Sequence, residues 1–389
     1  MTTNTTVNST NISVLGNALK KIKAIREFLN KKYVERTEII DALLVALLSG
    51  EHALLVGSPG TAKSDLIRDL VKLVQGSTLF DYLFTKYTTP DEVFGPLKLT
   101  MLQQDVFERK VEGFLPTAEF AFLDEIFKSN SAILNALLTL LNERIYHNGI
   151  NKIDCPLITT FGASNEYPED TENLSALFDR FLIRVEPKYI AEPANFLKMM
   201  RGALVDPPEA LTKEELTALQ NKAGEVLVEP VLLTINEIRE KLKNEGIQPS
   251  DRRFRKSLPI LQAKALLSGH MVVKPSDLSI MQHILWERPE QRDKVKSVVD
   301  TYSIDRLHKD LQDRYAEAQD IYEEVKNNPT PDAIVEASLK LQNIVGHLSG
   351  LQNQNQYKSR LGEIQQVLND VLKAKNLIET AVGLGRVGQ

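Results

Sequence analysis

The residues from Gly57 to Ser64 read GSPGTAKS, a combination that can bind the phosphates of a nucleotide. Glycines permit tight turns, so several backbone N–H groups can point at phosphate oxygens. In such loops the lysine reaches the β- and γ-phosphates, and the following serine can ligate Mg²⁺. We therefore predict that this loop binds a nucleoside triphosphate. The predicted contacts are Gly57, Ser58, Pro59, Gly60, Thr61, Ala62, Lys63 and Ser64.

The loop departs at one position from the pattern G-x-x-x-x-G-K-S/T. Its second glycine is Gly60, and Thr61 and Ala62 separate that glycine from Lys63. The alternative interpretation is an unrelated strand, turn and helix with incidental glycines. The apolar run Ala53–Val56 directly before the loop is typical of a buried parallel strand and favours phosphate binding.

A second apolar run, Phe120–Leu123, ends in two adjacent acids, Asp124 and Glu125. Taken by themselves, the two acids could simply mark a solvent-exposed strand end. The phosphate loop earlier in the chain favours a catalytic site instead. We predict that Asp124 and Ser64 hold Mg²⁺ and that Glu125 is the general base for the attacking water. The two motifs together predict hydrolysis of the nucleotide.

Alternating helical and strand-like segments surround these motifs and must position them. Apolar residues at helical spacing predict helices near residues 15–31, 35–48, 64–74 and 131–144, and residues 158–162 have the pattern of another buried strand. This alternation predicts an α/β fold with a three-layer αβα core around a parallel sheet.

Two segments between the motifs have the pattern of hairpins. One covers residues 98–114, and the other covers residues 145–156 and turns at Asn148-Gly149. The apolar residues of the first hairpin would form either an exposed tip or a face packed on the domain. These residues are Leu99, Met101, Leu102, Val106 and Phe107.

Strand-like runs disappear after Pro193, where Gly and Pro punctuate helical segments. We predict a disordered polar tail at residues 1–14, a nucleotide-binding core at 15–192, an all-helical lid at 193–290 and a C-terminal helical bundle at 291–389. The tail is predicted from its lack of apolar content.

The composition limits the class of protein. The 389 residues carry a net charge of −5, which gives no support to a broad nucleic-acid or anionic-membrane surface. The single cysteine, Cys155, excludes a disulfide framework within the chain. No apolar run reaches the length of a membrane span, and the first residues lack the pattern of a signal peptide. We expect a cytoplasmic protein.

The segment from Leu54 to Arg184 resembles the MoxR group of AAA+ ATPases and, within it, the RavA-like branch. The matching motifs, in order, are GSPGTAKS, TPDEVFGPL, FLDEIFK, ILNALLTLLNER, ASNE and ALFDRFLIR. The resemblance implies an AAA+ P-loop core followed by a helical lid, with ATP and Mg²⁺ as ligands. It also implies that the two hairpins are inserts that line a central pore or face substrate.

The resemblance assigns roles to two further residues of the core. Asn165 matches the sensor-1 asparagine, and Arg180 matches the arginine finger that enters the site of a neighbouring subunit, with Arg184 as a second candidate. From the residues alone, the alternatives are a loop-capping role for Asn165 and, favoured by the sequence, a surface ion pair of Arg180 with Asp179 or Glu186.

In the lid, Arg252 matches the sensor-2 arginine, and the adjacent Arg253 is the alternative. Val34 matches the segment that forms the adenine pocket, although a plain core residue is an equal interpretation. These assignments come from the resemblance.

The resemblance implies a ring, with six subunits expected, that remodels or matures protein complexes with a partner carrying a von Willebrand factor A (vWA) domain. It does not identify the client. A nucleic-acid motor is one alternative, against which the net charge argues. An ATP-gated assembly scaffold is another, but such a switch needs no general base at Glu125.

Overall fold

The computed structural model describes residues 3–168, 172–202, 205–303, 306–327, 330–354 and 361–385. The chain divides into two compact units, residues 1–303 and 304–389. All predicted site residues belong to the first unit. Among the described helices, none is long and apolar enough to cross a lipid bilayer.

A parallel five-stranded sheet forms the centre of the first unit, in the order β2-β3-β6-β1-β7. Every residue of β1, β6 and β7 is buried, as expected for strands covered on both faces. All carboxyl ends lie at one edge of the sheet, where open α/β sheets bind ligands. The strands are β1 (Ala53–Val56), β2 (Leu79–Leu83), β3 (Phe120–Asp124), β6 (Thr159–Ser164) and β7 (Ile183–Val185).

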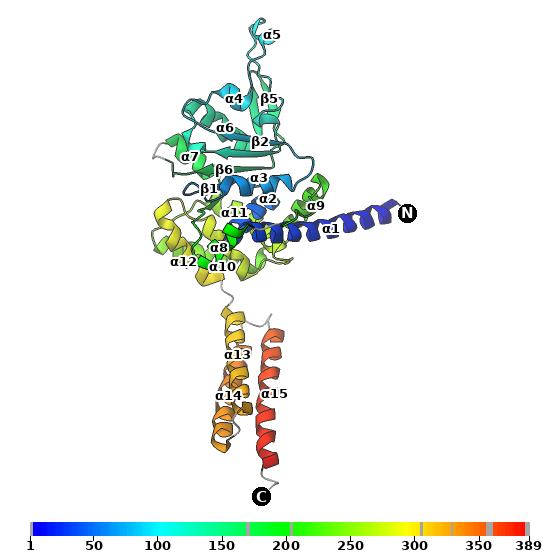
Figure 1. Cartoon of the computed structure of the whole chain (residues 1–389), viewed down its shortest axis with the longest axis vertical. Coiled ribbons are helices and arrows are strands. Elements are labelled where there is room, and N and C mark those ends of the chain that lie inside the picture. The colour runs from blue at the N-terminus through cyan, green and yellow to red at the C-terminus, as the bar shows by residue number, and fades with distance from the viewer. Residues whose placement is uncertain are drawn as a thin grey trace. The chain divides into compact units, whose positions relative to one another are not determined.

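Helices cover both faces of this sheet, so the predicted three-layer α/β core is confirmed. The helix α2 (Thr37–Ser49) packs on β1 and β7, and α3 (Lys63–Lys72) packs on β3 and β6. Figure 1 shows α6 (Ser131–Glu143) on the opposite side of the sheet from α2 and α3. The helix α7 (Glu172–Arg180) packs against α6 and leads into β7.

The two predicted hairpins lie together at one end of the first unit (Figure 1). The strands β4 (Ile145–Asn148) and β5 (Asn151–Asp154) form the hairpin expected at Asn148-Gly149. The other segment differs, because its tip is a short helix, α5 (Leu99–Leu102). The Asn148 side chain joins the segments: its Oδ1 accepts from the Arg109 backbone N at 2.7 Å, and its Nδ2 donates to the Arg109 O at 3.0 Å.

Of the two interpretations of the insert, the exposed apolar tip agrees with the structure. The side chains of Leu99 and Phe107 are 74% and 65% exposed, and Ile150 of the neighbouring turn is 90% exposed. Three short elements complete this part of the chain. The helix α4 (Pro90–Phe94) leads from β2 into the insert, η1 (Leu115–Thr117) leads back to β3, and η2 (Ile126–Lys128) follows β3.

The helical lid extends beyond the predicted end at residue 290. Its last helix, α12, buries Val295 and Val299 and packs on η4 and α10, so the first unit ends at Ser303. The lid elements are α8 (Pro193–Arg201), α9 (Lys213–Gly224), η3 (Glu229–Val231), α10 (Leu232–Asn244), α11 (Asp251–Leu267), η4 (Pro275–His283), η5 (Pro289–Gln291) and α12 (Arg292–Ser303).

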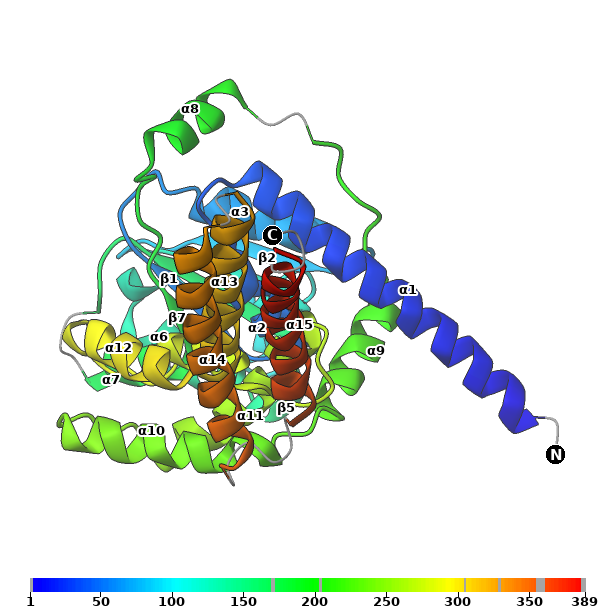
Figure 2. The ribbon, with the colours of Figure 1, turned by 90° about the horizontal axis from the view of Figure 1, so that it is seen from below.

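The polar segment predicted to be a disordered tail differs as well. Residues from Thr3 onward form the first turns of α1 (Thr3–Lys32), which extends away from the rest of the first unit (Figure 2). The second half of α1 buries Ile22, Ile25 and Leu29. Nucleation is the unfavourable step of helix formation, and here the packed half of α1 provides the nucleus. The preceding polar residues therefore only have to extend an existing helix.

Three long helices form the second unit in its described residues, as predicted. They are α13 (Arg306–Asn327), α14 (Pro331–Gln352) and α15 (Leu361–Gly385). Their shared core includes Leu341, Leu348 and Ile364, each fully buried. This unit therefore has a hydrophobic core of its own, separate from that of the first unit.

Candidate nucleotide site

The phosphate loop joins β1 to the first turn of α3. Gly57 N continues the pairing of the sheet by donating to Ser164 O at 3.1 Å. A Cβ at Gly57 would meet Pro187 O at 2.9 Å, so the loop requires glycine there. Ala62, which stands where the usual pattern has its second glycine, adopts a left-handed φ of 61°. A non-glycine residue in this conformation destabilises the fold by roughly 1 kcal/mol. The loop nevertheless has the same turn that a glycine would allow.

Lys63 lies at the centre of the predicted site and is 7% exposed. Its Nζ donates to Gly57 O at 2.6 Å, to Ser58 O at 3.0 Å and to Asn165 Oδ1 at 3.0 Å. Burial lowers the pKa of Lys63, an effect that nearby Asp124 and Glu125 oppose. The ammonium is thus held by neutral oxygens that a phosphate group could replace with a stronger, charged partner.

Two oxygen donors predicted to hold Mg²⁺ converge beside this lysine. Ser64 Oγ lies 3.1 Å from Asp124 Oδ2, although Ser64 begins a helix and Asp124 ends a strand. Hydroxyl and carboxylate oxygens suit Mg²⁺, which usually completes its shell with water and substrate phosphates. The residues present therefore fit the ion.

The predicted general base, Glu125, is 8% exposed and has a left-handed φ of 51° at the end of β3. Its two carboxylate oxygens have different partners. Asn165 Nδ2 donates to Oε1, and Lys128 Nζ lies 3.4 Å from Oε2. Because Asn165 also accepts from Lys63, a single amide connects the phosphate-binding lysine to the general base.

A cavity of about 450 Å³ adjoins the phosphate loop and suits a nucleotide base. Val34, predicted to lie in the adenine pocket, lines it together with Gly60, Thr61 and Ala62 of the loop. Phe196 of α8 supplies apolar surface on the other side. The wall is completed by Lys32, Tyr33, Arg36, Tyr189, Ile190 and Met199.

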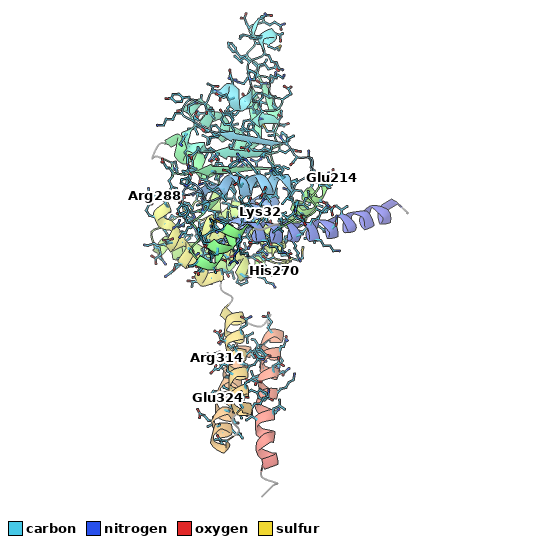
Figure 3. All side chains as sticks on the ribbon, in the orientation of Figure 1. Lys32, Glu214, His270, Arg288, Arg314 and Glu324 are labelled. Atoms are coloured by element: carbon cyan, nitrogen blue, oxygen red, sulfur yellow. The ribbon has the colours of Figure 1, made fainter. Side chains whose placement is uncertain are left out.

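Contacts from three elements hold this cavity in place. Tyr33 Oη and Lys32 Nζ, the latter labelled in Figure 3, each lie 2.6 Å from Asp69 Oδ2 of α3. Tyr189 Oη donates to Pro59 O of the phosphate loop at 3.1 Å. The end of α1 and the segment after β7 are therefore both tied to the element that would carry the phosphates.

Arg180 and Arg252 line a separate, small cavity with Asn142. Arg180 is 23% exposed, its nearest acid is Asp179 at 3.9 Å, and its Nε has no hydrogen-bond partner. Arg252 is exposed and donates to Asn142 Oδ1. Within the described residues, no hydrogen bond or ion pair joins either arginine to the phosphate loop of its own chain.

The second candidates for these roles, Arg184 and Arg253, are structural residues. Arg184 is 1% exposed, stacks on Phe178 and donates to three backbone carbonyl oxygens, including Trp286 O at 2.6 Å. Arg253 is 2% exposed and donates to Ile284 O at 2.8 Å and to Asp179. A buried arginine with its donors engaged cannot reach a neighbouring subunit, so Arg184 is wrong as a finger candidate.

This difference between the arginines predicts that their removal affects stability to very different extents. We expect Arg184→Ala to lower the free energy of unfolding by about 3–5 kcal/mol, because it leaves a cavity and removes the side-chain donor from three buried carbonyl groups. Urea denaturation would measure the loss. Arg180→Ala is the matched control and should change stability by less than about 1 kcal/mol; an equal loss in both variants would contradict the assignment.

The sequence interpretation missed Lys128 and Tyr189 as site residues. Lys128 has a usable signal, since it follows Glu125 by three residues and the 3₁₀ turn η2 brings such positions together. Tyr189 has none, because its contact with Pro59 spans 130 positions of the chain.

Two known families match this chain. The family described as the MoxR domain in MoxR–vWA–β-propeller ternary systems matches residues 20–221. A family described as an AAA lid domain matches residues 230–299. The first match contains every predicted residue of the core site, and the second contains Arg252.

Relatives extend the likeness through both regions. An uncharacterized protein of Methanocaldococcus jannaschii is 42% identical over 301 residues, which are 77% of this chain and 76% of that protein. Chaperone MoxR1 of Mycobacterium tuberculosis is 26% identical over 63% of this chain and 69% of its own. The crystal structure of a candidate ATPase from Cytophaga hutchinsonii matches with a TM-score of 0.61 and 21% identity, covering 76% of this chain and 96% of that one. At this identity, the last likeness supports the fold alone.

Proposed function

Because this chain belongs to the MoxR family of AAA+ ATPases, we propose that it hydrolyses ATP with Mg²⁺ in a hexameric ring and remodels or matures protein complexes. The chaperone relative supports a chaperone-like role. The RavA-like branch stays a prediction from the motifs. The observation that carries the proposal is the pair Arg180 and Arg252, two arginines that line one cavity and, within the described residues, form no hydrogen bond or ion pair with the phosphate loop of their own subunit.

The residues of one subunit divide the work of binding and hydrolysis. Lys63 exchanges the carbonyl oxygens of Gly57 and Ser58 for the β- and γ-phosphates of ATP. Ser64 and Asp124 would hold Mg²⁺, which neutralises phosphate charge when bound. Glu125 accepts the proton of the attacking water, and the Asn165 amide orients that water or the γ-phosphate.

The neighbouring subunit completes the site. An arginine finger stabilises the charge that develops as the γ-phosphate leaves, and it is effective when supplied in trans. Arg180 suits this role because part of its guanidinium is exposed and its Nε has no partner. Arg252 shares the same cavity wall, and we propose that it contacts the same nucleotide of the neighbour.

The inserts and a partner protein would convert hydrolysis into work on a client. The exposed Leu99, Phe107 and Ile150 give the insert tip an apolar surface suited to unfolded or hydrophobic segments. A vWA-domain partner is supported by the description of the matching family, which also mentions a β-propeller component. These partners are part of the proposal.

Mass measured by light scattering tests the ring directly. We expect a species of six subunits with Mg²⁺ and a non-hydrolysable ATP analogue, and smaller species without nucleotide. Turnover of ATP should rise with protein concentration, because the finger arrives only on assembly. A monomer under all conditions, with turnover independent of concentration, would contradict the trans-acting ring.

A further inference from the structure

A second cavity, of about 320 Å³, lies beside the base cavity and is lined by both the core and the lid. It shares Arg36 and Tyr189 with the base cavity, but none of the phosphate-loop residues line it. Most of the residues that line it carry charged side chains. The role of the nucleotide site does not account for this charge.

Most acids around this cavity are already engaged. Glu35 accepts hydrogen bonds from backbone N–H groups at 2.8 and 3.0 Å and so caps the segment leading into α8. Glu38 Oε1 lies 2.9 Å from His283 Nε2, and Glu186 pairs with Arg292. These acids therefore direct their hydrogen bonds and ion pairs to groups other than the remaining bases of the cavity.

Three bases of the lining, Arg36, Lys188 and Lys296, have no ion pair within the described part of the chain. The fourth acid, Asp293, is 86% exposed and its partner is Arg292 rather than one of these three. Lys188 and Lys296 line the same cavity. Both lower the pKa of Glu38, after the larger effect of the hydrogen bond with His283.

Arg36 is the least satisfied of the three. It is 8% exposed, its Nη1 donates to Glu35 O at 3.0 Å, and its Nε is buried without a hydrogen-bond partner. Burial lowers the pKa of Arg36, which reflects the cost of holding the charge away from water. Glu35 opposes this lowering of the pKa, but Arg36 forms no ion pair within the described residues, and buried charges are usually paired.

We propose that this cavity binds a small polyanion of the pyrophosphate class through Arg36, Lys188 and Lys296. The three bases come from the segment before α2, the segment after β7, and α12. Guanidinium and ammonium groups that line one cavity are common ligands of phosphate groups. A bound polyanion would connect the core to the lid and so limit the movement of one against the other.

Calorimetric titration with pyrophosphate tests the site separately from the phosphate loop. The protein is first saturated with ADP in buffer containing EDTA, so that the phosphate loop is occupied. We expect the wild type to bind one further equivalent of pyrophosphate. The double variant Lys188→Gln/Lys296→Gln should bind it at least about tenfold more weakly. The control Lys294→Gln changes a residue of the same helix that is 62% exposed and pairs with Glu245, and it should bind like the wild type.

Three outcomes would overturn the proposal: no heat with the ADP-saturated wild type, equal affinity in all variants, or release of ADP by pyrophosphate. Unchanged ADP affinity of the double variant would show that it is folded. If the wild type fails to bind ADP, the proposed ATPase function fails. The proposed polyanion site can then still be tested by titrating the Lys63→Ala variant with pyrophosphate. The phosphate loop of this variant is disabled, and pyrophosphate binding should persist.

Discussion

Glu125→Gln should lower kcat for ATP hydrolysis by about a hundredfold to ten-thousandfold while ATP still binds. The amide cannot accept the proton of the attacking water, but it keeps the shape of the carboxylate and can still contact Asn165. Lys63, Ser64 and Asp124 are unchanged, so binding of ATP should persist. Steady-state phosphate release and the affinity for a fluorescent ATP analogue would give the two quantities.

The matched control for charge is Glu237→Gln, an exposed position on α10. It should hydrolyse ATP like the wild type. Turnover of Glu125→Gln within threefold of wild type would show that another group accepts the proton. Loss of ATP binding together with turnover would instead indicate that Glu125 has a structural role in the site.

Arg180→Ala should lower kcat by about a thousandfold or more in assembled rings, with nucleotide binding and ring mass retained. The guanidinium stabilises charge that exists only in the transition state, so its loss should leave ground-state binding intact. The measurement is turnover at a protein concentration where light scattering shows the full ring. Arg239→Ala, at an exposed arginine paired only with its neighbour Glu240, is the control.

Mixing the two inactive variants distinguishes a finger in trans from one in cis. An Arg180→Ala subunit keeps Glu125, and a Glu125→Gln subunit can supply Arg180 to it. Mixed rings should therefore recover a measurable part of wild-type turnover. Absence of recovery in rings shown to be mixed would place the action of Arg180 within its own subunit.

Features encoded in contiguous residues agreed well between sequence and structure. An apolar run followed by glycines and Lys63 predicted a strand, a loop and a helix, and these are β1, the phosphate loop and α3. Because parallel strands end at one edge, the predicted residues after β1, β3 and β6 meet there. The contacts of Lys63 and Glu125 with Asn165 follow from this topology.

Features that depend on distant packing were not predictable in the same way. Arg180 and Arg184 lie four positions apart with similar neighbours in sequence, yet Arg184 is buried because the lid brings the Trp286 carbonyl to it across 102 positions. The end of the lid was placed too early for the same reason. Nothing local to α12 indicates that Val295 and Val299 pack on η4 rather than on the helices that follow.

The amide of Asn165 contacts both Lys63 and Glu125. Under the proposed mechanism, a subunit outside a ring has these groups but lacks the arginine finger of a neighbour. Unassembled subunits should therefore hydrolyse almost no ATP. A pool of unassembled subunits would then not deplete the ATP of the cell, because hydrolysis would take place only where rings have formed.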